Sequence, residues 1–90
     1  MQKILLIEDD LIMGESICDR FAIEKIAFKW ATSAEEAFLF LSQQLFDCMV
    51  SDIRLPDMSG EDLYIKAQKA GLINYPAIFI TGFGTQLQAE

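Results

Sequence analysis

Polar residues able to carry chemistry stand at the ends of three apolar runs in the sequence. Glu8, Asp9 and Asp10 follow the first run, Asp52 follows the second, and Thr81 ends the third. Carboxylates that are brought together repel one another unless a proton or a cation compensates their charge. The chain has no histidine, so a hard divalent cation such as Mg²⁺, which prefers oxygen ligands, is the expected compensator.

The chemistry that such a group of residues supports is phosphoryl transfer. A bound Mg²⁺ can bridge a phosphoryl group and neutralise the charge that develops on it. A carboxylate beside that ion can attack phosphorus and form an acyl phosphate. The hydroxyl of Thr81 could then donate a hydrogen bond to a phosphoryl oxygen.

Short apolar strands alternate with amphipathic helices along the chain. The expected strands cover residues 3–7, 28–31, 48–51 and 77–81, and the expected helices cover 11–24, 34–44 and 60–70, with another beginning near Thr85. This alternation predicts an α/β fold with a parallel sheet and helices on both faces. Right-handed crossovers place the carboxyl ends of the strands along one edge, where binding sites form in such sheets. The acidic residues and Thr81 are therefore expected to meet there.

Local signals set the expected ends of the helices and turns. Ser33 and Glu36 form a capping box ahead of the second helix, and Ser59 can cap the third. Asp10 is expected to be a cap or a first-turn residue of the first helix and not to bind the cation. Asp57 follows a proline and is expected to be a turn residue.

Composition limits the classes of function. With 90 residues, one domain is expected, and 52% hydrophobic residues are enough for a packed core. A net charge of −7 argues against a nucleic-acid-binding surface. Cys18 and Cys48 are predicted to be buried, reduced thiols, since no zinc-binding pattern accompanies them. Charges interrupt the first apolar run too early for a signal peptide or membrane span, so a cytoplasmic protein is expected.

Three motifs resemble the receiver domain of two-component response regulators: KILLIEDD at 3–10, FDCMVSDIRLPDMSG at 46–60 and AIFITGFG at 77–84. They are specific in combination and are spread over nearly the whole chain. The resemblance implies a flavodoxin-like, doubly wound parallel sheet with the strand order 2-1-3-4-5. The TGFG run is similar to that of receivers in sigma-54-dependent transcriptional activators.

The resemblance also implies roles for individual residues. Asp52 takes the place of the phosphoacceptor. Glu8 and Asp9 take the places of the acidic pair that binds Mg²⁺ together with Asp52 and the main-chain carbonyl of Arg54. Thr81 takes the place of the threonine that contacts the phosphoryl oxygen. The implied partner is a sensor histidine kinase. The implied activity is phosphorelay signalling and not enzymatic turnover of an external substrate, apart from self-catalysed phosphorylation and dephosphorylation.

The resemblance ends before the domain does. Receivers continue through a fourth helix, a fifth strand with a phosphate-contacting lysine and a switch aromatic, and a last helix, whereas the sequence stops at Glu90. Residues 1–90 are therefore expected to be a C-terminally incomplete receiver domain with the strand order 2-1-3-4. None of its lysines is assigned the missing role. The apolar edge near residues 77–90 is expected to seek a partner, so a homodimer is predicted.

Two other functions remain as alternatives. A truncated or pseudo-receiver would act as a protein-interaction or dimerisation module without phosphorylation. A hydrolase with an aspartate nucleophile would need a second acid two residues after Asp52, where Arg54 stands. Any effect on transcription would belong to a longer parent protein.

Overall fold

The computed structural model describes residues 3–80, and it also places residues 87–88 as a strand. The strands are β1 (Lys3–Ile7), β2 (Ala27–Ala31), β3 (Cys48–Asp52), β4 (Ala77–Ile80) and β5 (Leu87–Gln88), and the helices are α1 (Leu11–Ile23), α2 (Ala34–Gln43) and α3 (Gly60–Lys69). Through β4, the expected elements are confirmed in order and type, and their ends within the described residues differ by no more than one residue.

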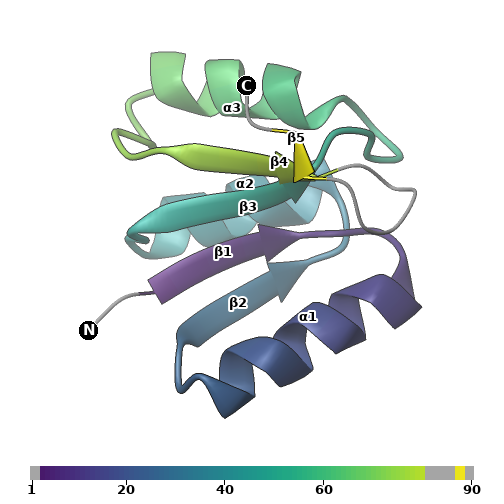
Figure 1. Cartoon of the computed structure of the whole chain (residues 1–90). Coiled ribbons are helices and arrows are strands. Elements are labelled where there is room, and N and C mark those ends of the chain that lie inside the picture. The colour runs from purple at the N-terminus through teal and green to yellow at the C-terminus, as the bar shows by residue number, and fades with distance from the viewer. Residues whose placement is uncertain (1–2, 81–86, 89–90) are drawn as a thin grey trace.

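The sheet has the order β2-β1-β3-β4-β5 (Figure 1). The first four strands are parallel, which confirms the predicted α/β sheet with the order 2-1-3-4. Beyond them, β5 pairs antiparallel with β4, so Ile80 lies opposite Leu87. The expectation of a bare β4 edge is therefore wrong over this stretch, because β5 supplies partners for the free backbone groups. The helix expected near Thr85 is wrong at residues 87–88, and Thr85 itself lies outside the described residues.

One face of the sheet is covered by two helices and is called the packed face. Leu5, Met49 and Phe79 point to it from β1, β3 and β4, and each is buried. Helix α2 packs against β1 and β2, while α3 packs against β4 and touches α2. In Figure 1, α2 lies behind the sheet and α3 lies beside β4. Because strand side chains alternate between faces, the neighbours of these residues must point the other way.

The opposite face is covered by α1 and is called the α1 face. Helix α1 packs against β2, where the Phe21 and Phe28 rings have centroids 5.6 Å apart. Leu6 is fully buried on this face, but Val50 is only half-buried and Ile78 is 44% exposed. The cover of the α1 face therefore thins from β1 towards β4.

The two cysteines are free thiols, as expected. The prediction that they are buried is wrong, because both are only partly buried. Burial is nevertheless the main cause that raises the pKa of each thiol. Among residues 3–80 and 87–88, no helix has the length and hydropathy needed to cross a bilayer.

Candidate functional site

The register of β1 and β3 brings two carboxylates together at the carboxyl edge of the sheet. Ile7 lies opposite Ser51, and Glu8 and Asp52 are the next residues along the two strands. Alternation places both of their side chains on the α1 face. One carboxylate oxygen from each of Glu8, Asp9 and Asp52 lies within 4.8 Å of the other two. The structure thus brings together the three acidic side chains that the sequence analysis singled out as cation ligands.

Burial gives this cluster unusual electrostatics. Glu8 is fully buried, Asp52 is 4% exposed, and Asp9 lies at the surface. Burial, aided by the negative charges of Asp52 and Asp9, raises the pKa of Glu8 to about 7, against the opposing hydrogen bond from the Asp10 N–H. Burial also raises the pKa of Asp52, against a hydrogen bond from the Arg54 N–H. At neutral pH, bound protons therefore neutralise part of the negative charge of the cluster.

One buried oxygen of the cluster lacks a partner. Glu8 Oε2 accepts a hydrogen bond from the Asp10 N–H at 3.1 Å, whereas Glu8 Oε1 is buried and has no hydrogen-bond partner among residues 3–80. Asp52 Oδ1 accepts a long bond of 3.4 Å from the Arg54 N–H. A buried carboxylate oxygen without a donor is costly. The donor set is therefore suited to a hard cation, which would supply the missing partner.

The backbone on either side of Glu8 is fixed by neighbouring elements. The Glu8 N–H donates to the Ala31 carbonyl of β2 at 2.9 Å, and Trp30 Nε1 donates to the Glu8 carbonyl at 2.9 Å. Asp10 caps α1, because its carboxylate accepts from the N–H groups of Ile12 and Met13. The prediction that Asp10 caps the helix is confirmed. The contact of Trp30 with the acidic segment was not predicted from the sequence.

The backbone that follows Asp52 passes very close to the residue that starts α3. A Cβ atom at Gly60 would lie 2.3 Å from the Asp52 carbonyl oxygen, and the Ser51 hydroxyl donates to the same oxygen at 2.8 Å. The Gly60 N–H donates to the Ile53 carbonyl at 2.7 Å. Residue 60 must therefore lack a side chain for the loop to close around Asp52.

Asp57 forms hydrogen bonds beyond its own turn. Its carboxylate accepts hydrogen bonds from the N–H groups of Ala34 at 3.0 Å and Glu35 at 2.9 Å, at the start of α2. These bonds, with that of Ala34 the strongest, hold the pKa of Asp57 below its usual range. Asp57 therefore ties the loop after Asp52 to α2, a role that the turn prediction missed.

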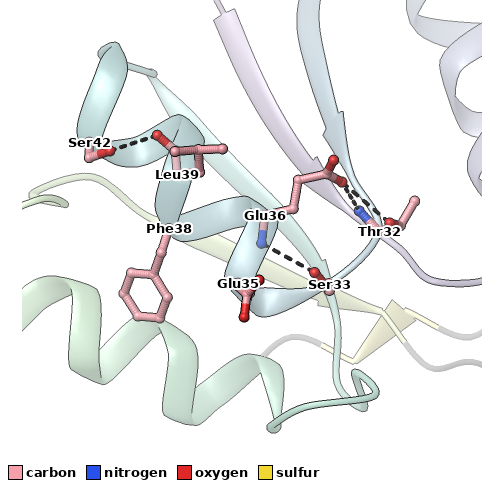
Figure 2. Close-up of a pocket in the computed structure, with 7 residues that line it drawn as sticks. All are labelled: Thr32, Ser33, Glu35, Glu36, Phe38, Leu39 and Ser42. Carbon is pink, nitrogen blue, oxygen red and sulfur yellow. Dashed lines mark hydrogen bonds between the residues drawn. The ribbon is translucent and has the colours of Figure 1, made fainter.

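The capping box ahead of α2 is present in altered form. Ser33 Oγ accepts from the Glu36 N–H at 3.2 Å, while the Glu36 carboxylate accepts from the Thr32 N–H and not from that of Ser33. The same residues line an open hollow of about 640 Å³ along α2, which reaches Ser42 (Figure 2). None of the three clustered carboxylates lines this hollow, so it is separate from the acidic site.

The remaining predicted site residues differ in what the structure shows of them. Arg54 lies two residues beyond Asp52, in the loop, and its backbone forms an isolated antiparallel β-bridge with that of Ser59. Its role as a carbonyl ligand stays a prediction. Thr81 lies outside the described residues, so its role stays a prediction as well.

Comparison with known proteins identifies the family. Residues 4–90 match the response regulator receiver domain family. The chain belongs to this family. The receiver is 32% identical over 82 residues to the transcriptional regulatory protein CrdR of Helicobacter pylori, a match that covers 89% of this chain and 38% of CrdR. The chain thus spans well under half the length of that relative. The name of CrdR does not test the sigma-54 subfamily, which stays a prediction.

Solved structures agree with the assignment. The non-phosphorylated receiver domain of HemR from Leptospira biflexa is 33% identical, with a TM-score of 0.78, and the match covers 96% of this chain and 68% of that one. The chemotaxis response regulator CheY4 of Vibrio cholerae has a TM-score of 0.85 at 19% identity, covering 94% and 72% of the two chains. That second likeness supports the fold alone. The flavodoxin-like fold predicted from the sequence is confirmed.

Proposed function

We propose that this receiver accepts a phosphoryl group on Asp52 from a sensor histidine kinase, as a cytoplasmic phosphorelay domain. In this proposal, Glu8, Asp9, Asp52 and the main-chain carbonyl of Arg54 hold Mg²⁺. The observation that carries the proposal is the meeting of three carboxylates within 4.8 Å, one of which has a buried oxygen with no partner in the described part of the chain. A structural acidic surface would not need to bury Glu8 completely.

The transfer requires Asp52 as an ionised nucleophile. One Asp52 carboxylate oxygen forms a bond to phosphorus while the bond between phosphorus and the histidine nitrogen breaks, and that nitrogen leaves with the electron pair. A bound Mg²⁺ supplies neutralising charge for the phosphoryl oxygens. Thr81 is proposed to donate a hydrogen bond to one of those oxygens. Turnover of an external substrate is not part of the proposal.

Glu8 links this proposal to pH. Because burial raises its pKa to about 7, Glu8 carries a proton in a large share of cation-free molecules at neutral pH. Cation binding requires the ionised carboxylate, so Mg²⁺ and the proton compete. Mg²⁺ binding is therefore expected to release protons near pH 7 and to weaken as the pH falls below 7.

Intact mass spectrometry tests the proposal directly. The domain is incubated with Mg²⁺ and acetyl phosphate, and the gain of one phosphoryl mass is followed with time. We expect the gain to need Mg²⁺ and to vanish in Asp52→Asn. Asp10→Asn is the matched control, since it removes one charge beside the cluster and asparagine caps helices well. Equal labelling of the Asp52→Asn variant would contradict the proposal.

An interaction module without phosphorylation is the second candidate. It is favoured by the exposure of Ile78 on the α1 face, where an apolar side chain faces water. The homodimer predicted from the sequence is placed at the edge formed by residues 77–90, a range that includes Ile78. Light scattering across a range of concentrations distinguishes the two candidates, because a phosphoacceptor domain does not require a dimer.

A further inference from the structure

Trp30 contacts the backbone between the two acidic residues that follow β1. Its indole Nε1–H donates to the Glu8 carbonyl oxygen at 2.9 Å. That carbonyl belongs to the peptide group that joins Glu8 to Asp9. Because a peptide group is planar, fixing its oxygen also fixes the direction of the Asp9 N–H. The indole therefore constrains how the Glu8 and Asp9 side chains leave the backbone relative to each other.

The indole acts where the β1–β2 ladder stops. The last bond between these strands in this direction runs from the Glu8 N–H to the Ala31 carbonyl. The chain then bends at residues 32–33 and enters α2 at Ala34. The Trp30 side chain serves as the donor to the Glu8 carbonyl at the point where the two strands part.

The sequence of α1 leaves room for this arrangement. A Cβ atom at Gly14 would lie 2.1 Å from Cζ2 and 2.5 Å from Cε2 of the Trp30 ring. Contacts this short are impossible, so any side chain at position 14 would force the ring to move. Glycine is unfavourable inside a helix, yet Gly14 is buried within α1. Gly14 and Trp30 thus form a matched pair, in which the helix admits the ring that reaches Glu8.

We propose that Trp30 is a positioning residue for the acidic pair, holding the Glu8–Asp9 peptide so that both carboxylates face the cation, with Gly14 making room for its ring. This inference rests on the proposed cation site. It assigns no chemistry to Trp30, which acts only through Glu8 and Asp9.

Replacing one atom group tests the inference. Trp30 is the single tryptophan of the chain, so biosynthetic replacement of tryptophan by 3-benzothienylalanine changes one position. This analogue keeps the bicyclic shape and has sulfur in place of the N–H. Isothermal titration calorimetry with MgCl₂ at pH 8 is expected to show about tenfold weaker binding, as when a hydrogen bond to a ligand residue is lost. Gly14→Ala, which displaces the ring, is expected to weaken binding several-fold.

The unmodified domain gives a second readout. Its one indole N–H resonance in a proton–nitrogen NMR spectrum should shift during the Mg²⁺ titration with the same midpoint as the calorimetric curve. An indole resonance that does not move during the titration would contradict the inference. This measurement does not depend on any variant folding well.

Phe28→Leu is the matched control. Phe28 lies on the same strand and packs on α1 through Phe21, but no hydrogen bond joins it to the acidic segment. We expect this variant to melt at a lower temperature and to bind Mg²⁺ as the wild type does. Equal Mg²⁺ affinity in the benzothienylalanine protein and the wild type would overturn the inference alone. A wild type that binds no Mg²⁺ would overturn the proposed function and the inference with it.

Discussion

The two faces of the sheet differ in how completely they are covered, and the acidic site lies on the less covered one. On the packed face, Met49 is fully buried in the same hydrophobic cluster as residues of α2 and α3. On the α1 face, Val50 is only half-buried in the same strand, and Ile78 is 44% exposed in the next. The packed face should therefore determine the stability of the domain, while the α1 face holds the acidic cluster.

At the carboxyl end of the α1 face, charged side chains are buried, whereas some apolar ones elsewhere on this face are partly exposed. Glu8 and Asp52 follow Leu6 and Val50 on this face, and both carboxylates are buried although they are charged groups. Natural cores avoid such placement unless a partner compensates. One face thus serves packing, and the other buries two carboxylates whose charge a cation or a proton would compensate.

The greatest loss of stability is expected from truncating a buried side chain on the packed face. Met49→Ala removes a fully buried side chain from the centre of the sheet, which should lower the free energy of unfolding by about 2–5 kcal/mol. Because a domain of this size is only marginally stable, the variant should be largely unfolded at 37 °C. Urea titration followed by circular dichroism measures the loss. A loss below 1 kcal/mol would mean that the packed face does not dominate stability.

The next effect concerns the buried charge on the α1 face. Glu8 titrates near 4.5 when unfolded and near 7 when folded, so between these pH values the folded domain binds more protons. Without Mg²⁺, the free energy of unfolding should therefore fall as the pH rises through this window, by on the order of 3 kcal/mol. The raised pKa of Asp52 acts in the same direction.

Glu8→Gln is the variant that tests this slope. It should flatten the pH dependence between 5 and 7 and stabilise the cation-free domain at pH 8. It should also abolish the rise in melting temperature that MgCl₂ is expected to give the wild type. Glu15→Gln, at an exposed position of α1, is the charge-matched control and should leave the pH slope, the stability at pH 8 and the response to MgCl₂ unchanged. An unaltered slope in Glu8→Gln would contradict the assignment.

A smaller effect is expected at the junction of the Asp52 loop with α2. Asp57→Ala removes the acceptor of two N–H groups at the start of α2 and should cost about 1 kcal/mol, as the loss of a helix cap does. Asp62→Ala removes the same charge from the first turn of α3 and is the control. If both variants lose equal stability in urea, the effect is one of net charge and not of the cap.

The smallest effect is expected at the exposed end of the α1 face. Ile78→Thr keeps a β-branched residue in β4 and should change the free energy of unfolding by less than about 0.5 kcal/mol. A loss comparable to that of Met49→Ala would mean that a second copy covers this face. Light scattering on the wild type and the variant at matched concentrations separates these outcomes.

The helices and strands could be predicted from the sequence, because local patterns of apolar and capping residues determine them. Apolar runs and caps gave the strands and helices through β4, and the parallel topology then placed Glu8, Asp9 and Asp52 together. Their meeting follows from strand ends alone, because parallel strands that end at one edge need no knowledge of side-chain packing.

The missed features depend on pairs of residues far apart in the chain. Asp57 bonds to residues 22 and 23 positions away, and Trp30 bonds to Glu8 across 22 positions. No local sequence pattern identifies the partner of either side chain. The distance between each side chain and its partner depends on how α1 and α2 lie against the sheet. Gly14, in the first turn of α1, was the one local signal that a bulky ring lies against the helix.

The pairing of Ile7 with Ser51 in the β1–β3 ladder has a consequence for how this chain tolerates insertions and deletions. Shifting β3 by one residue would turn Asp52 from the α1 face into the packed face and bring Ser51 to the place of the carboxylate. Length changes within β1 or β3 should therefore abolish the site even where the domain still folds. The connection between α2 and β3, at residues 44–47, lies outside these strands, so added residues there should leave the acidic cluster in register.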